Sequence, residues 1–335
     1  MSNSTLFHSD TYDGICSCNR RGFLKGAAGL LGGTALKSLA ASVAVLARAQ
    51  ATGQAEPRVE SNVVYGMYSG LALLMDVHYP AATNGYGIIF VPGTGFHGPL
   101  AYDAPPPKAT PAVATYAKSL LSVGYTLFVV NYRLAPRFRY PAAVEDVQRA
   151  VRYIRHNADR YRIRADRIGA LGGSAGGYLV DMLGVMEGVG DPDDSDPVNR
   201  ESAKVQCVVS FFGPTDLVRL PPSPVETDFL GMALSVGGQV LPTTSIEYKT
   251  YREASPVYRV TKDSPPFLLI HGEADKVVPI QNSELMEQQL RQAGVPVKLV
   301  RAPGLGHGSD FSSSPSLPEY LKEMVRWFDR YLQTP

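Results

Sequence analysis

The turn that most constrains the fold of this chain lies at residues 172–177, which read Gly-Gly-Ser-Ala-Gly-Gly. An apolar strand pattern over residues 167–171 leads into it, and a helical pattern over residues 178–183 follows it. A strand that turns directly into a helix brings two backbones so close that only glycine fits at the first and fifth positions of the turn. The turn therefore predicts helices packed on a sheet, with the hydroxyl of Ser174 above the sheet edge.

A serine in such a turn has two interpretations. Gly- and Ser-rich turns of this kind also bind phosphate or close ordinary loops, whereas a serine held this way can be a nucleophile. A nucleophilic serine needs a general base, usually histidine, and the base needs a carboxylate to orient it. Asp275 follows the apolar run 267–270, and His307 lies among glycines after the strand pattern 297–300. The order Ser174, Asp275, His307 therefore predicts a catalytic triad.

Four stretches of the chain carry a family resemblance. They are Asn-Tyr-Arg-Leu-Ala-Pro at 131–136, Tyr-Pro-Ala-Ala-Val-Glu-Asp at 140–146, the turn at 172–177 and His-Gly-Glu-Ala-Asp at 271–275. They resemble the α/β-hydrolase superfamily, and within it the carboxylesterases similar to hormone-sensitive lipase and to the feruloyl and acetyl-xylan esterases. The resemblance implies an α/β fold with a mostly parallel central sheet flanked by helices. It also implies a serine hydrolase that cleaves carboxylic esters through an acyl-enzyme, with no cofactor and no metal ion.

The stretch that would bind the oxyanion departs from this family. Such esterases commonly carry His-Gly-Gly-Gly, whereas this chain has Pro-Gly-Thr-Gly-Phe at 92–96. Backbone N–H donors do not depend on a particular side chain, so we expect the oxyanion hole to survive with an altered shape. Its donors are assigned to the N–H groups of Ala175, Gly95 and Thr94, the last provided that its backbone angles suit a β-branched residue. The expected pocket lining is Phe96, His97, Tyr178, Phe211 and Phe212.

Strand and helix patterns alternate along most of the chain, which favours βαβ units. The expected strands are 61–67, 71–79, 86–91, 125–131, 167–172, 204–212, 267–271 and 297–302, and the expected helices are 111–123, 142–157, 175–187, 281–293 and 317–332. The helix over 142–157 is amphipathic and should turn Arg149, Arg152 and Arg155 away from the sheet.

The alternation stops over residues 213–266, which contain several Pro- and Gly-rich segments. A stretch of this length inside a compact domain is usually a functional excursion. We interpret it as a small lid over the active site. The alternative is a surface insertion without catalytic contact.

The start of the chain predicts an export signal. Asn-Arg-Arg-Gly-Phe-Leu-Lys at 19–25 resembles the twin-arginine signal, and a Gly- and Ala-rich stretch and an Ala-Arg-Ala cleavage pattern at 47–49 follow it. Lys37 interrupts that stretch, which favours cleavage over a membrane anchor. The expected parts are a cleaved signal peptide at 1–49, a flexible leader at 50–60 and a catalytic domain at 61–335. We expect the twin-arginine machinery to deliver the mature protein to a bacterial periplasm or outside the cell, without a stable membrane anchor.

The composition narrows the partners. With 335 residues, 44% hydrophobic and 19% charged, the chain can bury a large core, and its net charge of +1 gives no reason to expect nucleic acid. The expected partner is a small-molecule or polymer ester. Two alternatives stay open: a peptidase or amidase that resembles the catalytic domain of prolyl oligopeptidase, and a non-catalytic binding protein on the same fold.

Overall fold

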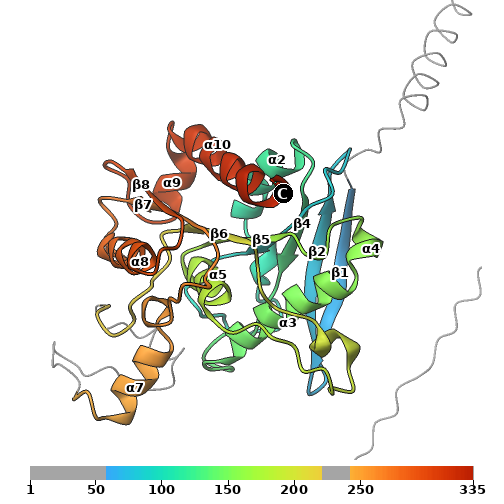
Figure 1. The fold of residues 1–335 in the computed structure, drawn as a ribbon, viewed down its shortest axis with the longest axis horizontal. Coiled ribbons are helices and arrows are strands. Elements are labelled where there is room, and N and C mark those ends of the chain that lie inside the picture. Colours follow the sequence, from blue (N-terminus) through green and yellow to red (C-terminus); the bar gives the residue numbers. More distant parts are fainter. Residues whose placement is uncertain (1–57, 221–241, 335) are drawn as a thin grey trace, which may run out of the picture. The chain divides into compact units, whose positions relative to one another are not determined.

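An eight-stranded sheet forms the centre of the computed structural model, which describes residues 58–220 and 242–334 (Figure 1). The strands are β1 (Arg58–Tyr68), β2 (Leu71–Tyr79), β3 (Gly87–Val91), β4 (Thr126–Val130), β5 (Ile168–Gly173), β6 (Cys207–Phe211), β7 (Phe267–Gly272) and β8 (Val297–Ala302). They lie in the order β1-β2-β4-β3-β5-β6-β7-β8. Strand β2 is antiparallel to β1 and β4, and every other pair in this sheet is parallel. The predicted mostly parallel sheet is confirmed.

Helices cover both faces of the sheet (Figure 1). This is expected because two neighbouring parallel strands are usually connected by a helix that crosses over one face of the sheet. Helices α2 (Ala112–Leu121) and α10 (Leu317–Phe328) share one apolar core with the sheet, and α3 (Ala142–His156), α5 (Ala175–Val185) and α8 (Gln281–Gln292) share the other. The shorter elements are α4 (Ala158–Tyr161), α7 (Ile246–Glu253), α9 (Ser309–Ser313), η1 (Pro107–Ala109), η2 (Pro197–Arg200), η3 (Pro256–Tyr258) and η4 (Asp329–Gln333). Each predicted strand and helix is present, and the short elements were not predicted.

The central strands β3, β4, β6 and β7 are buried along their whole length. Their sequences are continuous apolar runs because both faces of the strands lie against helices. In the described ranges no helix is long and apolar enough to cross a membrane.

The arginines of α3, which were expected to turn away from the sheet, contact other parts of the chain. Arg149 forms an ion pair with Asp196, with 2.7 Å between Nη2 and Oδ2. Arg152 and Arg155 donate hydrogen bonds to backbone carbonyls of the same segment, residues 187–204, at 3.1 and 2.6 Å. The segment 187–204 therefore covers this side of α3, and the expectation was wrong for Arg149, whose Nε also donates to the backbone carbonyl of Tyr65 in β1 at 3.1 Å.

The predicted signal peptide and most of the predicted leader lie outside the described residues. The predicted lid at 213–266 lies partly outside them. Its first described part is fixed to α8, where the Thr215 hydroxyl donates to the backbone carbonyl of Asn282 at 2.6 Å. The backbone N–H of Leu217 donates to the Ser255 hydroxyl at 2.9 Å, which ties the two described ends of the segment together. Its role as a lid stays a prediction.

The turn after β5 is closed by direct backbone contact. A Cβ atom at Gly172 would lie 2.2 Å from the carbonyl oxygen of Gly176, and one at Gly176 would lie 1.9 Å from that of Val91. The prediction that only glycine fits at these two positions is confirmed. The turn also gives Ser174 a φ of 55° and a ψ of −125°, a strained conformation for a residue with a side chain.

We expect Gly172→Ala to destabilise the protein by about 3 kcal/mol or more, because the new methyl group meets backbone atoms that cannot move aside. Gly173→Ala is the matched control, since a Cβ there makes ordinary contacts of 3.4 to 3.8 Å. Chemical denaturation of both variants tests this. Equal stability of the two would show that the turn is looser than the structure indicates.

Candidate active site

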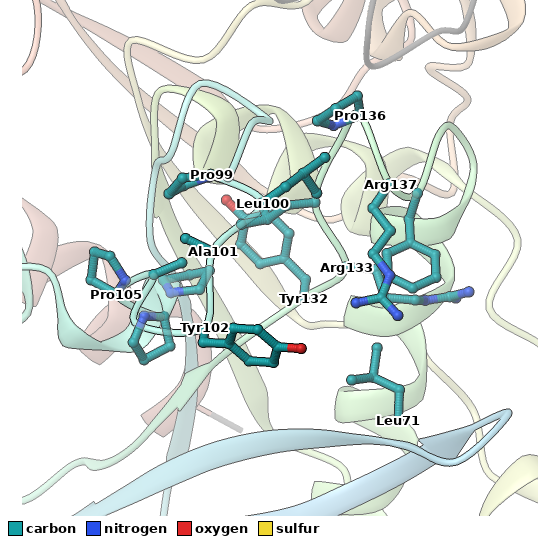
Figure 2. A pocket seen from close by; sticks show the side chains of 16 residues that line it. Leu71, Pro99, Leu100, Ala101, Tyr102, Pro105, Tyr132, Arg133, Pro136 and Arg137 are labelled. Atoms are coloured by element: carbon teal, nitrogen blue, oxygen red, sulfur yellow. The ribbon is translucent and has the colours of Figure 1, made fainter. Parts of the chain in front are cut away.

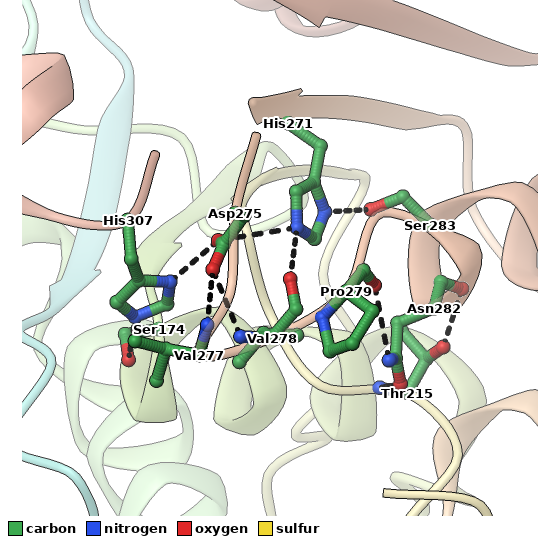
Figure 3. A network of polar contacts seen from close by, with 10 residues as sticks. All are labelled: Ser174, Thr215, His271, Asp275, Val277, Val278, Pro279, Asn282, Ser283 and His307. Atoms are coloured by element: carbon green, nitrogen blue, oxygen red, sulfur yellow. Dashed lines mark hydrogen bonds and ion pairs between the residues drawn. The ribbon is translucent and has the colours of Figure 1, made fainter. Parts of the chain in front are cut away.

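The parallel sheet brings the three predicted triad residues to one edge. Ser174 follows β5, Asp275 follows β7 and His307 follows β8, each at the carboxyl end of its strand. His307 Nδ1 lies 2.6 Å from Asp275 Oδ2, and His307 Nε2 lies 2.8 Å from Ser174 Oγ (Figure 3). An ionised carboxylate can only accept, so Nδ1 carries the proton and Nε2 accepts from the serine hydroxyl. Three residues more than 30 positions apart thus form one chain of hydrogen bonds.

Further donors hold the Asp275 carboxylate (Figure 3). The backbone N–H groups of Val277 and Val278 both donate to Oδ1 at 2.9 Å. Nε2 of the fully buried His271 lies 3.4 Å from Oδ2 and donates to the carbonyl oxygen of Val278 at 2.8 Å. Nδ1 of His271 lies 2.7 Å from the Ser283 hydroxyl, within hydrogen-bond distance. Sequence analysis did not assign His271 to the site, and its place beside the carboxylate requires the fold of the loop after β7.

These contacts keep Asp275 charged. Burial by itself raises the pKa of this carboxyl, but hydrogen bonds from His271, His307 and Val278 outweigh burial and hold the pKa well below its usual value. A permanent negative charge therefore faces His307 at neutral pH. Such a charge orients the imidazole and stabilises its protonated form.

The loop after β3 approaches the serine most closely through Gly93. A Cβ atom at Gly93 would lie 2.4 Å from the Gly173 carbonyl oxygen and 3.0 Å from Ser174 Cβ. Positive φ values in this loop fall on Gly95 and Phe96, at 63° and 62°, and not on Thr94. The backbone condition set for Thr94 is therefore met. The oxyanion donors Ala175, Gly95 and Thr94 stay a prediction, and Gly93 is the residue of this loop that lines the cavity at Ser174.

A cavity of about 460 Å³ opens beside Ser174. It is lined by Phe90, Gly93, Thr110, Pro111, Ala112, Tyr116, Gly173, Ser174, Phe212, Gly308, Ser312 and Ser313. Of the predicted pocket residues, Phe212 lies in this lining, and its ring packs on the His307 ring with 4.8 Å between centroids. The other walls come from the start of α2 and from α9, elements that no motif marked.

The remaining four predicted pocket residues do not line this cavity. Phe211 and Tyr178 are fully buried in the core. The ring of Phe96 is also buried and packs edge to face on Tyr178 at 5.1 Å. His97 is exposed, and its backbone forms an isolated β-bridge with Ala135. The assignment of these four residues to the substrate pocket stays a prediction, and none of them belongs to the lining of the cavity at Ser174.

A second cavity, of about 770 Å³, lies between residues 98–107 and 132–138 (Figure 2). It shares no lining residue with the cavity beside Ser174 and is therefore separate from it. Tyr132 lines it and fixes the oxyanion loop, because its hydroxyl donates to the Pro92 carbonyl at 2.7 Å and lies 3.0 Å from Thr94 Oγ1.

Comparison with known proteins gives the family of the chain and solved structures with a similar fold. The sequence profile of the BD-FAE family matches residues 75–290, well over half of the chain. The chain belongs to the BD-FAE family. A crystal structure of an acetyl ester-xyloside bifunctional hydrolase from Caldicellulosiruptor lactoaceticus is similar, with a TM-score of 0.68 and 25% identity over 82% of this chain and 97% of that one. The predicted α/β-hydrolase fold is confirmed.

Two curated relatives of this BD-FAE family member come from Mycobacterium tuberculosis. Esterase LipC is 31% identical over 67% of this chain and 53% of its own length. The probable carboxylic ester hydrolase LipM is 30% identical over 58% of this chain and 44% of its own length. The chain thus matches about half the length of these relatives.

The charge on Asp275 predicts a pH-dependent contribution to stability. A carboxyl whose pKa is lowered by folding stabilises the protein fully above its unfolded pKa of about 3.9, and this contribution is lost as the pH falls below that value. We expect Asp275→Asn to unfold at a lower temperature than the wild type at pH 7, with a gap that narrows between about pH 5 and pH 3. Thermal unfolding across this range, beside the exposed Asp103→Asn, tests this. A gap that is constant with pH would contradict it.

Proposed function

We propose that this BD-FAE family protein is a serine esterase that cleaves carboxylic esters with a Ser174-His307-Asp275 triad. The observation that carries the proposal is the continuous hydrogen-bonded chain from Asp275 through His307 to Ser174, with steps of 2.6 and 2.8 Å. A serine alone is a weak nucleophile, and this arrangement supplies both the base and the charge that orients it. The names of the curated relatives agree with ester hydrolysis.

The reaction follows from the geometry. Ser174 Oγ attacks the ester carbonyl while His307 Nε2 accepts its proton, and the Asp275 carboxylate holds Nδ1. The N–H groups of Ala175 and Gly95 stabilise the developing oxyanion, with Thr94 as a further donor. His307 then protonates the leaving alcohol, and an acyl-enzyme remains on Ser174. Water activated by His307 hydrolyses it and restores the free serine.

Small-molecule and polymer esters are the proposed substrates. Two similar solved structures are titled an acetyl ester-xyloside hydrolase and a carbohydrate esterase, and this chain covers 97% and 98% of them. No cofactor has a part in the proposed reaction. The cavity of about 460 Å³ is the space into which one part of the ester would fit.

An amide substrate is the second candidate. The acylamino-acid-releasing enzyme of Arabidopsis thaliana is 25% identical over 63% of this chain, which is 27% of that protein. Amide and ester cleavage use the same triad, so matched substrates must separate them.

We further propose that the chain is exported by the twin-arginine machinery, on the basis of Arg20 and Arg21 and the cleavage pattern at 47–49. A periplasmic or extracellular location would give the enzyme access to esters outside the cytoplasm. Fractionation of cells that express the wild type or Arg20→Lys with Arg21→Lys tests this, and equal export of both would contradict it.

We expect Ser174→Ala to lower kcat for 4-nitrophenyl acetate by about 10⁴ to 10⁶ and to leave the fold intact. The reason is that the nucleophile is lost while the turn and the oxyanion hole remain. The measurement is steady-state hydrolysis of 4-nitrophenyl acetate and of the matched 4-nitroanilide, with circular dichroism to check folding. Faster turnover of the anilide would favour the amidase.

The exposed Ser122→Ala is the matched control and should behave as the wild type. Turnover that persists in Ser174→Ala would remove Ser174 from the mechanism. No turnover of any ester or amide by the wild type would favour a binding protein.

A further inference from the structure

Among the residues that line the cavity beside Ser174, Tyr116 is the one buried residue with a side-chain hydroxyl. Tyr116 lies on α2 and has only 6% of its surface exposed. The other hydroxyl-bearing residues of the lining, apart from Ser174, are Thr110, Ser312 and Ser313, and these are half-buried or exposed. Tyr116 is therefore the polar group that a substrate would meet at depth.

The ring of Tyr116 is held rigidly. It packs edge to face against Phe90 at 5.5 Å and against Phe211 at 5.0 Å, between ring centroids. Aromatic contacts on two sides fix the direction of the phenol oxygen. A group fixed in this way is arranged in advance for a ligand and loses little freedom when the ligand binds.

The Tyr116 hydroxyl makes no hydrogen bond with any described residue. Among the described residues, several buried polar atoms without a partner are almost completely inaccessible to solvent, and the Tyr116 oxygen is not one of these. Its accessible surface is therefore assigned to the cavity that the residue lines. Burial raises the pKa of this phenol, which therefore stays protonated and able to donate. A substrate oxygen at this position would accept a hydrogen bond from the phenol, and a substrate that displaced water from the cavity without such an oxygen would leave the phenol unpaired.

The rest of the lining defines the kind of group that fits. Phe90 and Phe212 give aromatic walls, and none of the described residues that line the cavity carries a charge. A charged substituent would lose its hydration there without gaining a counterion. A plain alkyl chain would leave the phenol unpaired. The complementary group has an apolar body and one uncharged oxygen.

We propose that Tyr116 determines substrate specificity, and that the part of the ester that enters this cavity carries an uncharged ether, hydroxyl or ketone oxygen beyond the ester group. The proposal rests on the proposed esterase function. Either side of the ester could supply this oxygen, the acyl group or the alcohol, and the experiment below separates the two.

The test compares the wild type with Tyr116→Phe, which removes the hydroxyl and keeps the ring. The acyl arm uses 4-nitrophenyl esters in two pairs. The first pair is the butyrate and the methoxyacetate, and the second is the 4-methylpentanoate and the 4-oxopentanoate. The alcohol arm pairs n-butyl acetate with 2-methoxyethyl acetate. Members of a pair have nearly the same shape, and their different intrinsic reactivity cancels when variant and wild type are compared on each ester.

We expect Tyr116→Phe to lower kcat/KM about tenfold for the oxygen-bearing member in at least one arm, and to change the alkyl member less than twofold. The arm that responds identifies whether the acyl or the alcohol group occupies the cavity. Tyr125→Phe, whose hydroxyl donates to Asp329 away from the cavity, is the control and should leave every ratio unchanged.

Equal changes for both members of every pair would overturn the proposal, because the hydroxyl would then make no specific contact. This failure differs from failure of the esterase function. In the latter case the wild type would turn over none of these esters, and both proposals would fall. Thermal unfolding of Tyr116→Phe checks that the core contacts with Phe90 and Phe211 persist.

Discussion

The backbone contact that closes the turn after β5 is the constraint on which the site depends. Gly172 lies against the backbone of Gly176, and Gly176 lies against the backbone of Val91 at the end of β3. These contacts pack the start of α5 against the sheet. This packing forces Ser174 into strained angles and lifts its hydroxyl above the sheet edge. The same approach brings Gly93 against the serine, so one contact places both the nucleophile and the loop that carries the proposed oxyanion donors.

Close to this turn, several hydrogen-bond donors stabilise the buried negative charge of Asp275. Asp275 accepts from two backbone N–H groups and from the imidazole of His307, and His271 stands beside it. An isolated carboxylate in such a place would be too costly to keep ionised. Its donors come from the loops that follow β7 and β8, so the charge of the site and the pairing of these two strands support each other.

Several of the residues that line the cavity come from different elements than the predicted triad, so substrate specificity and the reacting groups can have separate structural origins. The sheet edge supplies Ser174, His307 and Asp275, and α2 and α9 supply part of the walls. Solved structures titled as an acetyl ester-xyloside hydrolase and a carbohydrate esterase have a fold similar to that of this chain. Differences in substrate among such proteins can then arise in wall residues such as Tyr116, since the reacting groups are fixed by the strands.

The sequence by itself determined the strands, the main helices and the order of the triad residues, because apolar runs and glycine-rich turns act locally. Tertiary structure decided the rest. The arginines of α3 meet a loop from residues 187–204, and Phe211 and Tyr178 turn into the core, because long-range packing selects which neighbour each face receives. Tyr116 occupies an ordinary buried position of an amphipathic helix, and only the assembled cavity shows that it lines the same space as Ser174.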